Sequence, residues 1–136
     1  NLFTDNTKKA NVYYRIATMY SKSNKVQART YARKALAVKP SYGKAYLLIA
    51  SLYGSSINEC GSTQFEKRAV YWLAAQYCDK AAAADSTLKG KASGDAARYR
   101  AAAPSKTEIF QENKAGQRIA FKCWIGESVV VPNIGK

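Results

Sequence analysis

The chain has 136 residues, of which 47% are apolar, so it is long enough and apolar enough to fold as one domain with a hydrophobic core. It has 22 Lys and Arg against 9 Asp and Glu and no His, which removes the residue that most general bases and many zinc sites use. The net charge of +13 favours an acidic partner, although a basic surface also serves solubility alone.

The first predicted helix spans about residues 7–21 and follows a cluster of capping residues that begins at Asp5. A polar turn leads to a second helix over residues 25–38, which ends before Pro40 because proline cannot continue it. Small residues on one face of the second helix suit close packing of another helix. The opposite face carries a predicted basic patch at a spacing of four residues, formed by Lys25, Arg29 and Arg33.

A third helix is predicted over residues 42–53, and its nearly continuous apolar sequence indicates that other elements cover it on both sides. Residues 54–62 are rich in Gly, Ser and Asn and predict a surface loop. A fourth helix then begins at Thr63, with Glu66 three residues later as the second member of a predicted capping box, and runs to about residue 84.

In the C-terminal part of the chain, the spacing of apolar residues changes from a helical period to an alternating one. A weaker helical pattern over residues 87–103 predicts a fifth helix, and Ser105 with Glu108 predicts a capping box that opens a short sixth helix. From residue 117 the apolar residues alternate with period 2, which predicts a β-hairpin of about 15 residues. Because an isolated hairpin is marginally stable, we expect its apolar face to pack on the helices.

One residue pattern occurs twice in the helical part. Tyr, Ile, Ala and Tyr stand at positions i, i+3, i+4 and i+7 of the first helix, and the same four types recur 33 residues later in the third helix. A two-helix unit of this period is typical of helical-repeat arrays. The repeated residues are Tyr13, Ile16, Ala17 and Tyr20, followed by Tyr46, Ile49, Ala50 and Tyr53.

Together with Ala28, Ala35 and Pro40 in the second helix and Ala74 and Ala81 in the fourth, these residues resemble the tetratricopeptide-repeat pattern. The resemblance implies an all-α helical-repeat fold, an α-α superhelix closed by a small C-terminal β-hairpin. We therefore expect two parts. The expected parts are a repeat region over residues 1–104, with two helix pairs, a capping helix and an insertion at 54–66, and a C-terminal part over residues 105–136, with a short helix and a hairpin packed on the repeats.

The C-terminal part carries a narrower resemblance. Cys60-Gly61, residues 68–72, residues 104–106 and residues 123–127 look like the end of a group of exported bacterial tetratricopeptide proteins. This resemblance implies an extracytoplasmic location, in the periplasm or at the outer membrane. It also implies that the chain is the C-terminal piece of a longer envelope protein.

The resemblance implies a non-enzymatic scaffold that binds another protein, with the ligand on the inner surface of the first helix of each pair. Tyr, Asn, Thr and Lys at these positions suit an extended peptide or a partner helix that carries acidic residues. The alternative is that the same side chains pack on an upstream repeat. The matching positions are Asn11, Tyr14, Thr18 and Lys22 in the first pair and Lys44, Leu47 and Ser51 in the second.

Two other functions compete with the scaffold. Residues 1–44 contain ten Lys and Arg and one acid, Asp5, so this basic third of the chain could bind nucleic acid or anionic lipid. No nucleic-acid motif accompanies the charge, and aromatic residues do not alternate with the bases as stacking platforms would. The sequence contains no phosphate-binding glycine loop and no nucleophile elbow, so we predict no enzyme activity, no cofactor and no metal.

The three cysteines have no metal-ligand spacing. Cys78 lies at a core position of the repeat pattern, whereas Cys60 lies in the long loop and Cys123 in the hairpin. A disulfide between Cys60 and Cys123 would tie the loop to the hairpin and would fit an oxidising compartment. The alternative is that both are unpaired thiols.

Overall fold

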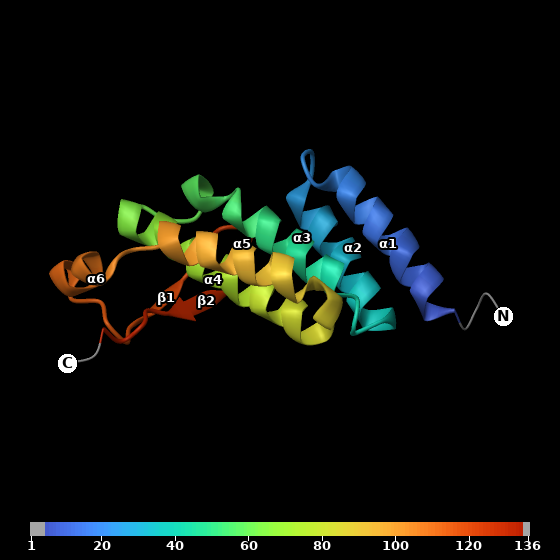
Figure 1. Cartoon of the computed structure of the whole chain (residues 1–136). Helices are drawn as coiled ribbons and strands as arrows, with labels where there is room; N and C mark the ends of the chain where they lie inside the picture. Colours follow the sequence, from blue (N-terminus) through green and yellow to red (C-terminus); the bar gives the residue numbers. More distant parts are fainter. Residues whose placement is uncertain (1–4, 135–136) are drawn as a thin grey trace.

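A computed structural model describes residues 5–134, which form six α-helices and one two-stranded antiparallel sheet. Figure 1 shows α1 at one edge of a stack of helices, with α6 and the sheet at the far end. The helices are α1 (Asn6–Tyr20), α2 (Lys25–Val38), α3 (Gly43–Gly54), α4 (Gln64–Ala84), α5 (Lys89–Ala102) and α6 (Lys106–Glu112), the short 3-10 helices are η2 (Ile57–Glu59) and η3 (Ser86–Leu88), and the strands are β1 (Arg118–Ala120) and β2 (Ser128–Val130).

Capping side chains begin the helices at or next to the predicted positions. Asp5 accepts a hydrogen bond from the backbone N–H of Lys8 at the start of α1, and Ser105 forms the complete capping box of α6. The predicted capping box of α4 is only half formed. The Thr63 hydroxyl accepts from the N–H of Glu66, but the Glu66 carboxylate accepts from Ser62, because the loop delivers both the N–H and the hydroxyl of Ser62 to it.

Two helix pairs share one arrangement of tyrosine rings. In the first pair Tyr31 of α2 lies 6.2 Å and 6.0 Å from the ring centroids of Tyr13 and Tyr20 of α1. In the second pair Tyr77 of α4 lies 6.2 Å and 5.2 Å from the rings of Tyr46 and Tyr53 of α3. The offset is 33 residues between the first helices of the pairs and 46 between the second helices, so the second pair contains 13 additional residues. The repeated sequence pattern is therefore also a repeated packing arrangement.

Helix α3 lies in the centre of the fold, as its apolar sequence predicts. It packs on α2 on one side and on α4 on the other, and α4 packs in turn on α5. The approach of α3 to the end of α4 is close at Gly43, where an added Cβ would lie 2.9 Å from the carbonyl oxygen of Ala81. A residue with a side chain at position 43 would therefore push the two helices apart.

The predicted hairpin is present but much shorter than expected. Strands β1 and β2 pair antiparallel over only three residues each, with Ile119 opposite Val129. The 15-residue hairpin with Cys123 and Ile125 in a strand is wrong, because residues 122–125 form a turn. The buried side chains of this C-terminal segment pack into the same core as the helices, and they are Phe121, Ile125, Val129 and Val131.

Candidate functional site

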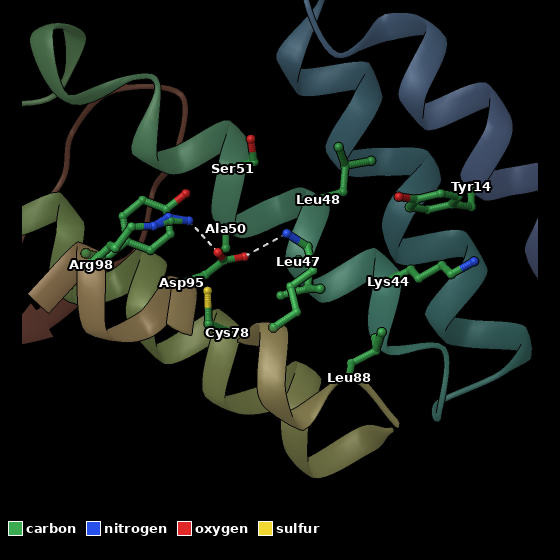
Figure 2. Close-up of a pocket in the computed structure, with 12 residues that line it drawn as sticks. Tyr14, Lys44, Leu47, Leu48, Ala50, Ser51, Cys78, Leu88, Asp95 and Arg98 are labelled. Atoms are coloured by element: carbon green, nitrogen blue, oxygen red, sulfur yellow. Dashed lines mark hydrogen bonds and ion pairs between the residues drawn. The ribbon is translucent and has the colours of Figure 1, made fainter. Parts of the chain in front are cut away.

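A groove of about 510 Å³ opens between α1, α3 and α5. Figure 2 shows its lining, with side chains from α1, α3 and α5 and the Cys78 sulfur of α4. Four of the seven positions expected to contact a ligand line this groove, and they are Tyr14 of α1 and Lys44, Leu47 and Ser51 of α3.

The α1 and α3 sides of the groove combine aromatic, apolar and cationic groups. Lys44, Leu47 and Ser51 lie on one face of α3 because they are spaced three and four residues apart. The Tyr14 ring packs edge-on against the ring of Tyr42 at a centroid distance of 5.6 Å, and partial burial raises the pKa of the Tyr14 phenol. Tyr14 therefore faces the groove as a neutral, fixed ring.

The α5 side of the groove is a charged cluster. The Asp95 carboxylate pairs with the Lys91 ammonium at 3.4 Å and with the Arg98 guanidinium on the next turn. The Asp95 side chain is 19% exposed, whereas the two basic side chains are 68% and 67% exposed. The groove edge thus has two exposed cations held in place by one recessed carboxylate.

The floor of the groove has no ionised group of its own. Burial raises the pKa of the Cys78 thiol to about 11, with the nearby carboxylates of Asp95 and Asp79 adding to the effect. Cys78 is the free cysteine of the described chain and is buried. The Tyr99 ring beside it stacks on Tyr71 at 5.9 Å, and its burial raises the pKa of its phenol as well. A neutral thiol and a neutral phenol make this floor a surface for contact, because neither supplies a nucleophile near neutral pH.

The other three expected ligand positions lie outside the groove lining. The Asn11 side-chain oxygen accepts a hydrogen bond of 2.6 Å from the hydroxyl of Tyr42, and the Thr18 hydroxyl donates to the carbonyl oxygen of Arg15 in its own helix. Lys22 lies in a separate depression beside Trp124. The groove therefore follows the middle of α1 rather than its whole length.

Sequence reasoning missed the α5 side of the groove entirely. Lys91, Asp95 and Arg98 are spaced four and three residues apart, which places them on one face of a helix. That spacing was visible in the sequence. The sequence did not show that this face of α5 lies at the groove opposite α1 and α3. The position of α5 depends on packing between segments that are distant in the sequence.

The predicted basic patch of α2 faces the protein's own C-terminal segment. The Arg29 guanidinium donates to the carbonyl oxygens of Ile125 at 2.7 Å and Trp124 at 3.1 Å, and to the hydroxyl of Tyr53 at 3.0 Å. Its central carbon lies 4.9 Å from the centroid of the Trp124 ring. Arg29 is thus bound on several sides by groups of the same chain.

The other two residues of the patch are also engaged. The Lys25 ammonium donates to the Ser55 carbonyl oxygen at 3.2 Å and the Ser56 hydroxyl at 2.9 Å, and it pairs with Glu59 at 3.3 Å. The Arg33 guanidinium lies 3.6 Å from the Glu127 carboxylate, with half of its side chain exposed. The patch therefore holds the loop between α3 and α4 and the C-terminal segment against α2.

Glu127 joins α3 to α4 by hydrogen bonds and pairs with Arg33 of α2. Its carboxylate accepts hydrogen bonds from the hydroxyls of Tyr53 at 2.5 Å and Tyr77 at 2.8 Å. Burial, and then the hydrogen bond to Glu127, raises the pKa of both phenols, so they remain neutral donors. We call Arg29, Tyr53, Tyr77 and Glu127 the clasp.

Cys60 and Cys123 form a disulfide with a Cα–Cα distance of 5.0 Å, the pair that the sequence left open. The bond connects the loop after α3 to the turn that follows β1, 63 residues further along the chain. Cys123 is followed directly by Trp124 and Ile125, whose carbonyl oxygens accept hydrogen bonds from Arg29. The disulfide thus joins the loop between α3 and α4 to the C-terminal segment, and Lys25 and Arg29 hold these two segments against α2.

Within residues 5–134, no helix is long and apolar enough to cross a membrane, and no group of three or more Cys, Asp or Glu could hold a metal ion. Comparison with protein-family models, curated proteins and solved structures found no match for the chain. The groove and the clasp are therefore interpreted from their own geometry.

Proposed function

We propose that the protein is a non-enzymatic scaffold of the tetratricopeptide-repeat type that binds a peptide segment with acidic residues in the groove between α1, α3 and α5. The observation that carries the proposal is the groove itself, where side chains of three helices surround an open hollow of about 510 Å³. The repeated tyrosine arrangement of the two helix pairs supports the repeat assignment.

The chemistry of the groove favours an acidic peptide. Lys44, Lys91 and Arg98 bring three cations to its lining against one carboxylate, Asp95, which already pairs with two of them. Leu47 and its neighbour Leu48 supply an apolar surface between these charges. A peptide with an apolar residue next to Asp or Glu would match both features.

The contacts of the basic patch argue against the nucleic-acid alternative. Lys25, Arg29 and Arg33 bind the loop and the C-terminal segment of their own chain, so phosphate contacts would have to displace those bonds. We propose no second function on this basis. The Cys60–Cys123 disulfide supports an oxidising compartment, and we propose the bacterial envelope as the location, within a larger envelope protein.

Selection from a random peptide display library tests the groove. We expect the selected peptides to combine an apolar residue with Asp or Glu, and a synthetic copy to bind about tenfold more weakly to Lys44→Glu, since that change replaces an attraction with a repulsion. Leu47→Asp should weaken binding as strongly. The matched control is Lys106→Glu, which makes the same charge change at an exposed position of α6.

Two results would contradict the scaffold proposal. One is a selection that enriches no sequence, or peptides whose binding is the same in Lys44→Glu, Leu47→Asp and the control. The other is binding of single-stranded RNA or DNA that falls steeply with salt and is abolished by Lys44→Glu, because this would assign the groove to a polyanion.

A further inference from the structure

The outer face of α1 exposes large apolar side chains. Val12 is 51% exposed and Met19 is 75% exposed, and the partly buried Ile16 lies between them on the same face of the helix. This face points away from α2, because Ala10 and Ala17 make the buried contact on the opposite side. Figure 1 shows α1 at the edge of the helix stack, with α2 as its neighbour.

The internal repeat allows this face of α1 to be compared with the corresponding face of α3. Helix α3 corresponds to α1 with an offset of 33 residues, and it packs on α2 as well as on α4. The tyrosines that α3 shares with α1 face α4, and three further apolar positions lie on another face of the helix. These positions in α3 are buried, with exposures of 0% for Ala45, 1% for Ile49 and 3% for Leu52, and they correspond to Val12, Ile16 and Met19.

The outer face of α1 therefore corresponds to a face that is buried in α3. A shallow depression along it, with a volume of about 280 Å³, is lined by Lys8, Lys9, Val12 and Tyr13. The side chains of a second helix can pack against an apolar stripe and into a depression beside it.

The charges around this face select the kind of helix. Lys8 and Arg15 flank the apolar stripe and are exposed, and α1 contains no Asp or Glu over its whole length. A covering helix would therefore meet cations at the edge of the contact. Basic residues beside the apolar stripe of the covering helix would repel these cations, whereas acidic residues there would pair with them.

We infer that the outer face of α1 is a docking surface for an amphipathic helix of a partner protein, whose apolar stripe is bordered by Asp and Glu. Val12, Ile16 and Met19 supply the apolar contact, and Lys8 and Arg15 pair with the acidic border. This surface is separate from the groove, which α1 lines through Tyr14 on another of its faces.

Two other occupants fit less well. A second copy of the chain would bring the basic flanks of one α1 against those of the other in a molecule of net charge +13. An anionic membrane would also attract Lys8 and Arg15. However, three apolar side chains, of which only Val12 and Met19 are strongly exposed, offer little area for insertion into lipid.

A peptide derived from α2 tests the proposal, because α2 packs on α3, the helix that corresponds to α1. The probe has the sequence of residues 25–38, is stapled to keep it helical and carries a fluorescent label. Its four bases are replaced by Lys25→Glu, Arg29→Glu, Arg33→Glu and Lys34→Glu. The charge control is the unaltered, stapled α2 peptide.

Fluorescence anisotropy with the whole protein gives the comparison. We expect the acidic peptide to bind at least about tenfold more tightly than the basic one, and Met19→Asp to lower its affinity about tenfold. Phe110→Asp is the matched control, since Phe110 is 74% exposed on α6, at the other end of the molecule. That variant should bind the acidic peptide as the unaltered protein does, and circular dichroism should show both variants folded.

Each remaining outcome overturns the inference. Failure of the acidic peptide to bind, equal binding of both peptides, or an equal loss in Met19→Asp and Phe110→Asp removes the evidence for a helix site on α1. Loss in Leu47→Asp but not in Met19→Asp places the peptide in the groove instead. Sedimentation that shows self-association abolished by Met19→Asp assigns the face to a second copy, and binding to phosphatidylglycerol vesicles abolished by the same change assigns it to a membrane.

Discussion

Arg29 connects three parts of the molecule, which are α2, α3 and the C-terminal segment. One guanidinium of α2 reaches two carbonyl oxygens of the C-terminal segment, a phenol of α3 and the face of an indole ring. Its neighbour Arg33, one helical turn further on, makes one longer ion pair and is half exposed. The same residue type at a spacing of four therefore has two different structural roles.

This difference predicts unequal effects of the same substitution. Arg29→Gln should lower the free energy of unfolding by about 2–3 kcal/mol, because the carbonyl oxygens of Trp124 and Ile125 lose a charged donor. Arg33→Gln, the matched control, should cost less than about 1 kcal/mol, as exposed ion pairs usually do. Urea unfolding followed by circular dichroism gives both values, and equal losses would contradict the role assigned to Arg29.

A second arginine predicts a pH effect. The Arg68 guanidinium donates to the Glu108 carboxylate at 2.6 Å and to the carbonyl oxygens of Ala102 and Ala103, so it joins α4 to the junction of α5 and α6. The hydrogen bond from Arg68, followed by that from the Ser105 N–H, lowers the pKa of Glu108 from 4.5 to about 2.

Because the pKa is lower in the folded state, the stabilising contribution of Glu108 is complete above about pH 4.5. It is lost as the pH falls through about 2. Carbon-13 NMR of the side-chain carboxyl should show this low pKa, and Arg68→Met should raise it. Asp85 is the internal control, since its pKa is lowered by hydrogen bonds from Thr87 and should not respond to Arg68→Met.

Among the elements, the helices and the presence of a C-terminal hairpin were predictable from the sequence, and the length of the hairpin was not. Helix starts at Asp5, Asn24 and Ser105 follow from local capping, which involves residues three positions apart. The turn at residues 122–125 follows from contacts that no local pattern contains. The carbonyl oxygens of Trp124 and Ile125 accept from Arg29, 95 and 96 residues away, and this contact lies in the turn rather than in a strand.

Helix spacing predicts a contrast between two glycines. Gly43→Ala should lower the free energy of unfolding by about 1–3 kcal/mol, because the new Cβ would lie 2.9 Å from the Ala81 carbonyl oxygen, where α3 meets α4. Gly94→Ala in α5 should raise it by about 0.5–1 kcal/mol, since no atom lies within 4 Å of the added Cβ and alanine is the better helix former. Thermal unfolding of both variants is the measurement, and effects of the same sign would contradict this account of the packing.

At the scale of the whole molecule, the Cys60–Cys123 bond closes a large loop of chain that contains α4, α5 and α6. Removing a cross-link of this length should cost about 4 kcal/mol, because the unfolded chain gains conformational freedom. The double variant Cys60→Ser with Cys123→Ser should therefore unfold at a lower urea concentration than the unaltered protein. Dithiothreitol should lower the midpoint of the unaltered protein to that of the variant, and it should leave the variant unchanged. A midpoint that does not respond to dithiothreitol would contradict a stabilising disulfide.

The candidate groove was predictable on its α1 and α3 sides only. Tyr14, Lys44, Leu47 and Ser51 follow from the repeat pattern, which relates positions within one helix. Asp95 and its two cationic neighbours come from a segment with weak helical propensity, and they reach the groove because α5 packs on α4. A repeat pattern carries no information about such a segment, which belongs to neither copy.

The clasp has a mechanical consequence for the groove. The Glu127 carboxylate accepts from Tyr53 of α3 and Tyr77 of α4 and pairs with Arg33 of α2, and Arg29 of α2 donates to Tyr53. These bonds fix the angle at which one helix pair follows the other. That angle sets the distance between Tyr14 on α1 and Asp95 on α5, across the mouth of the groove. None of the four clasp residues lines the groove, so we expect substitutions in the clasp to change the width of the groove without removing any of its lining side chains.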